Sequence, residues 1–144
     1  SNSSAASDVY KRQYLDKAIA ANPRAEYYKV KGRLYEEISN EAEAIACFEK
    51  ALEINPQLAD VWSEMGRIYY NKAYEESQEI NKIKDDKAYL KAREERIFPL
   101  YRKALPYYEK AYSIDPTNAD CVFALKGIYY TLGMEDKLKS LEGK

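Results

Sequence analysis

An internal repeat constrains the fold of this chain more than any other feature of its sequence. Three segments, 14–23, 47–56 and 107–116, align without gaps, and each carries an acidic residue, lysine and alanine before it ends in Asn-Pro or Asp-Pro. Pro23 and Pro56 lie 33 residues apart, whereas Pro56 and Pro116 lie 60 apart. Because 33 or 34 residues is the length of one helical hairpin unit, the longer interval predicts a hairpin with an insertion of about 26 residues.

Small and bulky residues recur within the repeat at positions that suit closely packed antiparallel helices. Gly32 and Gly66 fall on the expected first helices of two hairpins. Helix axes 8–10 Å apart need such small residues where the two backbones approach. The Asn-Pro and Asp-Pro pairs are expected to end second helices, because proline pushes the preceding residue out of the α region. The small residues on the second helices are Ala44, Ala51, Ala104 and Ala111.

These positions resemble the signature of the tetratricopeptide repeat, W-x2-L-G-x2-Y followed by A-x3-F and P. One copy is filled by Tyr28, Gly32, Tyr35, Ala44, Phe48, Ala51 and Pro56. The next is filled by Trp62, Met65, Gly66, Tyr69, Ala104, Tyr108, Ala111 and Pro116. A third copy keeps Leu125 and Tyr129, but Lys126 replaces the expected glycine. The resemblance implies an all-α fold, a right-handed superhelical stack of antiparallel helix hairpins with one hairpin lengthened by the insertion.

The repeat alignment predicts a short N-terminal segment followed by one domain. Residues 1–7 are expected to be disordered or an artificial addition, and residues 8–144 to form a single domain. The first helix of that domain has no partner helix before it, which suggests further repeats upstream in the parent protein. The expected parts of the domain are an orphan second helix (8–23), repeat 1 (24–57), repeat 2 with its insertion at about 71–98 (58–117), and a terminal repeat (118–144).

The insertion is rich in helix-forming residues except at its polar centre, residues 81–86. We therefore expect both helices of this hairpin to be lengthened into an arm that turns near residues 81–86. Pro99 and Pro106 fall inside the returning helix, where each removes an N–H donor and is expected to kink or break it. The terminal hairpin is expected to turn at residues 132–134, and its second helix to be short and charged, as in a capping repeat.

A narrower resemblance comes from the charged insertion together with segments 101–111 and 125–134. This arrangement is similar to the C-terminal part of a group of bacterial tetratricopeptide proteins, many of which are exported to the cell envelope and lack a catalytic domain. The resemblance alone suggests the cell envelope, with the periplasm as the compartment. The cytoplasm is the alternative.

Composition argues against several classes of function. Lysine and arginine number 23 against 24 acidic residues, so the positive excess that nucleic-acid binding needs is missing. No apolar run approaches the roughly 18 residues of a membrane span. Histidine is absent, which removes Ser-His and Cys-His pairs and histidine metal sites. Cys47 and Cys121 are not spaced as metal ligands are, and we expect both to be small buried side chains. We therefore predict no catalytic residue, no metal site and no cofactor, in a chain that is a monomer.

The resemblance also implies where a partner binds. First helices line the concave side of such a superhelix, so we expect a groove there that holds a protein or peptide segment. Arginine and tyrosine side chains suit a peptide that carries a carboxylate and an apolar group. The predicted function is a non-catalytic protein–protein interaction scaffold. The groove candidates are Lys29, Arg33, Glu36, Ser63, Arg67, Tyr70, Asn71, Phe123 and Tyr130.

Two alternatives remain open at this point. The chain could be the substrate-recruiting region of a larger enzyme, such as a protein glycosyltransferase whose repeats select acceptor proteins. It could also serve a structural role by self-assembly through its terminal hairpins. The sequence names no ligand, and fold analogy cannot supply one.

Overall fold

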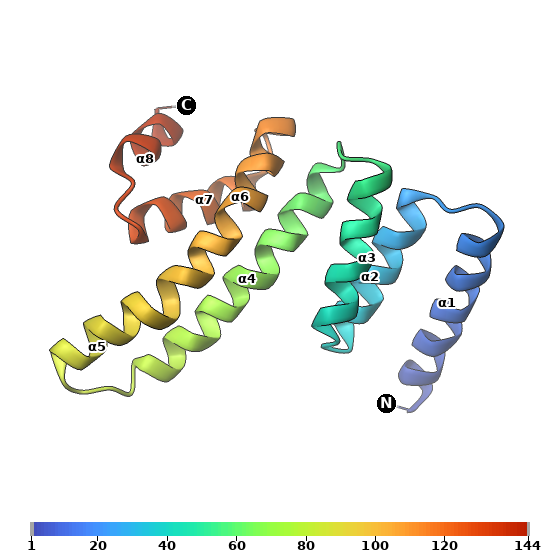
Figure 1. Cartoon of the computed structure of the whole chain (residues 1–144), viewed down its shortest axis with the longest axis horizontal. Helices are drawn as coiled ribbons and strands as arrows, with labels where there is room; N and C mark the ends of the chain where they lie inside the picture. Colours follow the sequence, from blue (N-terminus) through green and yellow to red (C-terminus); the bar gives the residue numbers. More distant parts are fainter. Residues whose placement is uncertain (1, 144) are drawn as a thin grey trace. The chain divides into compact units, whose positions relative to one another are not determined.

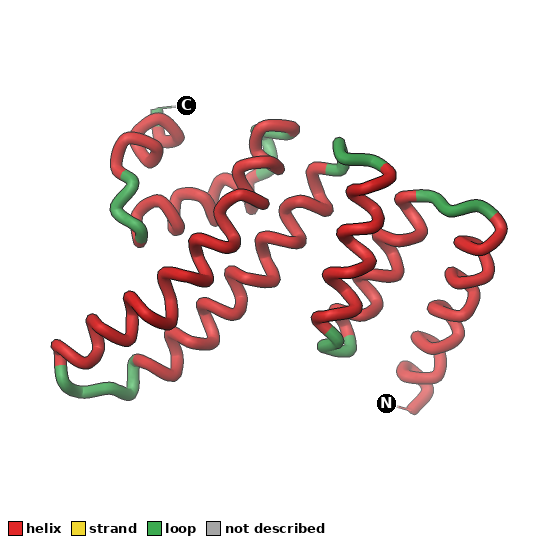
Figure 2. Tube along the Cα trace, in the orientation of Figure 1, coloured by secondary structure: helices red, strands yellow, loops and turns green. Residues whose placement is uncertain are grey.

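The computed structural model describes the backbone of residues 2–143 and the side chains of residues 5–143. Within these residues the regular elements are all helices, joined by short loops (Figure 2). This confirms the predicted all-α fold class. Two compact units, Ser1–Val61 and Trp62–Lys144, are each described by themselves.

Unit 1 is built on a helix hairpin with one further helix before it. The helices are α1 (Asn2–Ala21), α2 (Ala25–Glu37) and α3 (Glu41–Ile54), labelled in Figure 1. α2 and α3 form the hairpin, and Ala44, Phe48 and Ala51 of α3 are completely buried in it. These are the small and bulky positions of the repeat, so the predicted first hairpin is confirmed.

The start of α1 differs from the prediction for residues 1–7. α1 begins at Asn2, so residues 2–7 are helical rather than disordered; the alternative that they are an artificial addition stays a prediction, and residue 1 lies outside the described part of the chain. Residues 2–7 contain no proline or glycine and two alanines, Ala5 and Ala6, so nothing in their sequence stops a helix from extending backwards from residue 8.

Two first helices end in the same way. After α2, Ser39 has a φ of 59°, and Asn40 donates its N–H to the Tyr35 carbonyl at 2.9 Å. After α7 (Ala119–Thr131), Gly133 has a φ of 69°, and Met134 donates to the Tyr129 carbonyl at 2.8 Å. Both are Schellman motifs, in which a left-handed residue lets the chain satisfy the last helical carbonyls. The predicted turn at residues 132–134 is confirmed.

Because Ser39 holds a left-handed conformation that glycine adopts without steric cost, Ser39→Gly is expected to stabilise unit 1. We expect the free energy of unfolding to rise by about 0.5–1 kcal/mol, less than the full left-handed penalty because glycine also loosens the unfolded chain. Urea denaturation followed by circular dichroism measures the change. Gly133→Ala is the reverse exchange at the equivalent turn and should destabilise by a similar amount. A Ser39→Gly variant less stable than wild type would contradict the argument.

Unit 2 contains the lengthened hairpin. α4 (Ala59–Ile80) leads out, a short loop follows, and α5 (Asp86–Ala92), a π-helical turn η1 (Arg93–Ile97) and α6 (Phe98–Ile114) return beside α4 (Figure 1). Ala73, Ile80 and Ile97 form a buried apolar cluster between the outgoing and returning helices. The Arg96 guanidinium also bonds Glu76 across the arm at 2.7 and 2.8 Å. The predicted arm, with its turn near residues 81–86, is confirmed.

The prolines of the returning helix affect it less than expected. Pro99 is in the first turn of α6, where a missing N–H matters little. The turn just before it widens instead, since Phe98 donates its N–H to the Arg93 carbonyl five residues back. α6 continues through Pro106, so the expected break does not occur there. Pro106 is exposed while Ala104 and Tyr108 beside it are buried, so packing on the other side of the helix offsets the lost hydrogen bond.

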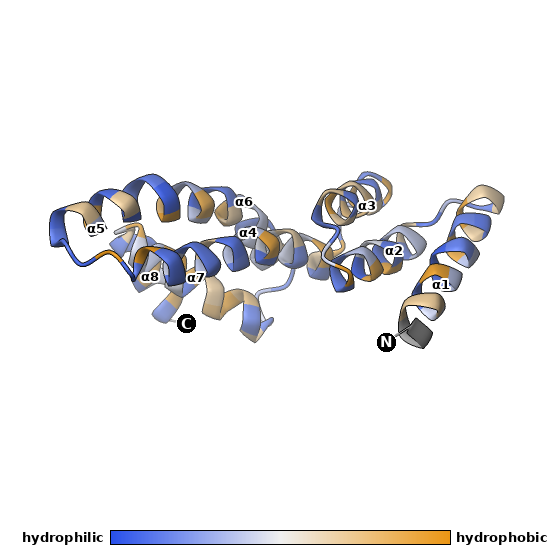
Figure 3. Cartoon of the chain, turned by 90° about the horizontal axis from the view of Figure 1, so that it is seen from below, coloured by the Kyte–Doolittle hydropathy of each residue, from blue (hydrophilic) through white to orange (hydrophobic). Residues whose placement is uncertain are grey.

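The terminal hairpin completes unit 2. α7 buries Cys121, Leu125 and Ile128, and the Asn118 side chain caps it by accepting from the Cys121 N–H at 3.0 Å. α8 (Glu135–Glu142) is short and buries one residue, Leu141. Figure 3 shows polar and apolar residues alternating along α4 and α6, as expected of helices with one packed side.

Candidate functional site

Two glycine–aromatic contacts decide which side of each first helix faces outward. A Cβ atom on Gly32 would lie 2.6 Å from Cε1 of Phe48, and a Cβ on Gly66 would lie 2.7 Å from Cδ2 of Tyr108. Each glycine therefore lies directly on the ring of its second helix. The opposite side of α2 in unit 1, and that of α4 in unit 2, are each left as a candidate binding side of their own unit.

In unit 1 the basic candidates meet an acidic residue of the chain itself. Lys29 and Arg33 lie 3.1 and 3.2 Å from the same Asp60 oxygen, and Lys29 also lies 2.9 Å from Glu26. Hydrogen bonds to Glu26 and then to Asp60 raise the pKa of Lys29. Glu36, on the same helix, is half-buried. A partner carboxylate at Lys29 or Arg33 would have to compete with Asp60, so these residues form an ion cluster of unit 1.

Tyr70 lies between three helices of unit 2. Its ring centroid is 5.5 Å from that of Tyr101 and 6.3 Å from that of Tyr108, both on α6. Its hydroxyl oxygen lies 3.4 Å from the point that a Cβ on Gly127 of α7 would occupy. Tyr70 is half-buried. It therefore forms the floor where α4, α6 and α7 meet.

The most exposed aromatic side chains of unit 2 lie on α7. Phe123 and Tyr130 are 74% and 75% exposed and are seven positions apart, so they share one side of the helix. Gly127 lies between them and offers no side chain. Together with Tyr70 below them, these residues define a surface that we name the α7 aromatic face: Tyr70, Phe123, Gly127 and Tyr130.

The remaining candidates are on α4, beside Tyr70. Ser63, Arg67 and Asn71 follow one another at four-residue spacing and so share a side of the helix. Arg67 is exposed, and its positive charge favours ionisation of the Tyr108 hydroxyl, although burial is the larger effect and raises the pKa of Tyr108. Arg67 thus places a positive charge close to Tyr108, against which Tyr70 also packs.

One polar cluster was not anticipated from the sequence. Tyr129 donates its hydroxyl to Glu109 at 2.7 Å, and Lys137 of α8 donates to the same oxygen at 2.9 Å, beside a cavity of 190 Å³. Burial, followed by the hydrogen bond to Glu109, raises the pKa of Tyr129. The cluster fastens α8 to α6 and α7. Its members lie 20 and 28 residues apart, so local sequence patterns carried no signal for it.

Comparison with known proteins agrees with this architecture. A TPR repeat model matches residues 32–72, and a tetratricopeptide repeat model matches residues 100–118. The chain thus contains tetratricopeptide repeats. The solved structure of MamA matches it with a TM-score of 0.63 and 20% sequence identity, over 90% of this chain and 61% of that one. This chain thus spans less than two thirds of MamA. No curated protein matches it.

The tetratricopeptide repeats and this fold support a general role as a protein-interaction scaffold. The groove residues and the compartment stay predictions. No helix within residues 2–143 has both the length and the apolar character to cross a membrane.

The two cysteines of this tetratricopeptide protein are buried, as predicted. Cys121 is completely buried, its Sγ lies 3.3 Å from the Tyr108 carbonyl oxygen, and burial raises its pKa to about 11. Burial also raises the pKa of Cys47. Because the thiolate is the nucleophile and the metal ligand, both side chains are held in their unreactive form at neutral pH. Among the side chains of residues 5–143, no group of three or more His, Cys, Asp or Glu is arranged to hold a metal ion.

Proposed function

We propose that this protein is a non-catalytic scaffold that holds a segment of a partner protein on the α7 aromatic face. The observation that carries the proposal is the exposure of Phe123 and Tyr130, 74% and 75%, on one side of α7. Burying a side chain of this size stabilises a complex by about 1.5–3 kcal/mol. Aromatic residues are also enriched among the few positions that dominate binding energy.

The shape and charge of the surface indicate the chemistry of the partner segment. Because Gly127 has no side chain, we propose that one apolar side chain of the segment lies between Phe123 and Tyr130. The exposed Arg67 on α4 suits a carboxylate of the same segment, because a guanidinium binds carboxylates through two parallel hydrogen bonds. We therefore propose a short segment with one bulky apolar residue and one acidic residue.

A display library of random peptides, selected on the purified chain, tests this function. We expect enriched peptides to carry the apolar and acidic pair, and to bind Phe123→Ala/Tyr130→Ala at least tenfold more weakly than wild type. Leu90→Ala is the matched control, because Leu90 is 54% exposed on α5, outside the aromatic face. Peptides that bind the double variant as tightly as wild type, or a selection that yields no binder, would contradict the proposal.

A further inference from the structure

The arm of unit 2 carries two arginines that lie over one aromatic ring. The guanidinium carbons of Arg93 and Arg102 are 5.2 and 5.7 Å from the centre of the Phe98 ring. Arg102 is exposed, whereas Arg93 and Phe98 are half-buried. We name Arg93 and Arg102 the arginine pair.

The arginine pair has no carboxylate partner in the described part of the chain. Two acidic residues of the arm are already paired, Glu76 with Arg96 at 2.7 Å and Glu95 with Lys91 at 4.0 Å. Among the side chains of residues 5–143, neither member of the pair forms an ion pair. A guanidinium that stacks on a ring can still bind a carboxylate through its planar fork of N–H donors. The pair is therefore a positive site that the described side chains leave without a counter-charge.

The exposure of this site results from the insertion. Arg102 and Glu109 lie seven residues apart and so share a side of α6. At Glu109 this side is covered by the third hairpin, since Tyr129 of α7 and Lys137 of α8 both donate to its carboxylate. The lengthened arm continues past that hairpin, as Figures 1 and 3 both show. Repeats in such an array contact only their neighbours, and the neighbour on this side is the third hairpin itself.

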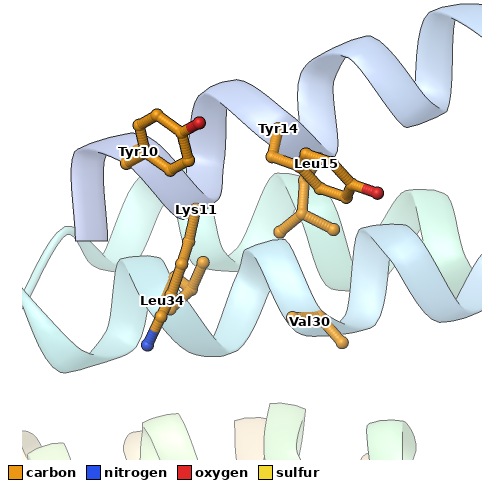
Figure 4. Close-up of a pocket in the computed structure, with 6 residues that line it drawn as sticks. All are labelled: Tyr10, Lys11, Tyr14, Leu15, Val30 and Leu34. Carbon is orange, nitrogen blue, oxygen red and sulfur yellow. The ribbon is translucent and has the colours of Figure 1, made fainter. Parts of the chain in front are cut away.

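The apolar groove of 350 Å³ between α1 and α2 of unit 1, shown in Figure 4, is a different case. Leu15, which lines it, aligns with Phe48. A first helix preceding α1 in the same array would therefore cover Leu15 as α2 covers Phe48. For this reason the openness of that groove does not indicate a partner, whereas the exposure of the arginine pair is set by elements that the structure describes.

Tyr101 connects the arginine pair to the α7 aromatic face. Its ring centroid is 5.5 Å from that of Tyr70, the floor of that face. Burial, and then the nearby Tyr70 hydroxyl, raise the pKa of Tyr101, whereas the positive charge of Arg93 lowers it; Arg93 therefore lies near the Tyr101 hydroxyl. From Tyr101 back to Arg93 is eight residues, about 12 Å along the helix. An extended chain covers that length with about four residues.

We propose that the partner segment held on the α7 aromatic face continues along the arm and places a second acidic residue at the arginine pair. The inference rests on the proposed function and adds the direction and length of the segment. Charge complementarity carries it, because two guanidinium groups without a counter-charge lie beside one ring, and a guanidinium binds a carboxylate through two parallel hydrogen bonds. The second acidic residue should follow or precede the apolar residue of the segment by at least about four residues.

Selecting the same random peptide library on wild type and on Arg93→Gln/Arg102→Gln tests the inference. Glutamine keeps much of the side-chain stem over Phe98 and removes only the charge and the fork. We expect wild-type peptides to carry the second acidic residue, and to bind the double variant about tenfold more weakly in fluorescence polarisation. Changing that residue of the peptide to its amide should weaken binding to wild type by the same factor and leave binding to the double variant unchanged.

Lys84→Gln/Lys87→Gln is the matched control, since it removes the same charge from two exposed positions of the arm that do not contact Phe98. It should change the affinity by less than about twofold, and all variants should keep the circular dichroism spectrum of wild type. The inference is overturned if wild-type peptides carry no second acidic residue, or if both proteins bind them equally.

The double variant Phe123→Ala/Tyr130→Ala separates this failure from failure of the proposed function. Peptides that depend on Phe123 and Tyr130 but not on the arginine pair would leave the α7 aromatic face standing and refute only the continuation along the arm. Peptides that depend on the arginine pair alone would refute the α7 aromatic face, and with it a segment that runs from that face to the arm. A selection without binders refutes both.

Discussion

Replacing Phe48 with alanine is expected to lower the free energy of unfolding of unit 1 by about 3–5 kcal/mol. The Phe48 side chain is completely buried between α2 and α3, and its ring lies directly under Gly32. Removing the ring leaves a void that the small neighbouring residues cannot fill, because Gly32 has no side chain and Ala44 and Ala51 have only a methyl group each. Domains are stable by only 5–15 kcal/mol in total, so this loss should shift the urea midpoint of the circular dichroism signal strongly.

Phe123→Ala is the matched control for that experiment. It removes the same ring from a position that is 74% exposed, and its stability should stay within about 0.5 kcal/mol of wild type. If Phe48→Ala were no less stable than Phe123→Ala, Phe48 would not be the core of the hairpin, and the packing described for unit 1 would be wrong.

The second large effect is expected at Gly66. A Cβ there would lie 2.7 Å from Cδ2 of Tyr108, whose side chain is only 4% exposed and has little room to move. Alanine favours a helix over glycine by about 1 kcal/mol, but forcing a methyl group against a buried ring costs about 1–3 kcal/mol and in general more than the propensity gain. We therefore expect Gly66→Ala to lower the thermal midpoint.

Gly127→Ala separates the gain in helix propensity from the steric cost of the added methyl group. Gly127 is also helical, but its nearest contact would be the Tyr70 hydroxyl at 3.4 Å, an ordinary distance that a small shift of the side chain relieves. Here the propensity gain should prevail, and the variant should be as stable as wild type or more so. Equal behaviour of Gly66→Ala and Gly127→Ala would show that close helix approach is not what requires glycine at position 66.

The same contacts bear on the proposed binding surface. Gly32 and Gly66 hold each first helix against its second helix, so the residues on the other side of α2 and α4 keep a defined orientation. The α7 aromatic face depends on this orientation, since Tyr70 of α4 forms its floor.

Much of the fold was predictable because its signals are local and repeated. The recurrence of Ala18, Ala51 and Ala111 in phase with Asn-Pro and Asp-Pro gave the hairpin period, and the excess between the second and third copies located the arm. The turns at residues 81–85 and 132–134 were found for the same reason, since polar residues and glycine mark them directly. The π-helical turn before Pro99 was not predicted, because a missing N–H can be accommodated by a wider turn as well as by a break.

The exposure and ion pairing of the candidate site residues could not be predicted from local sequence patterns. Tyr70 and Tyr130 occupy the same position in successive repeats, yet Tyr70 is half-buried and Tyr130 is 75% exposed. Tyr70 has Gly127 of the following hairpin over it. For Tyr130, no residue in the described part of the chain plays that role. Likewise, Lys29 and Arg33 appeared to be available cations until Asp60 was found beside them, 31 and 27 residues along the chain.

Helix positions, hairpin partners and the arm follow from residue size and backbone preference, which act between neighbours in the chain and can be read from the order of the amino acids. Exposure and ion pairing depend on which element lies opposite a given side chain. That depends on distances between residues remote in sequence, so it became visible only when the helices were packed together. The sequence thus determined which residue occupies each repeat position. Only the tertiary structure determined whether that residue is exposed and can contact a partner.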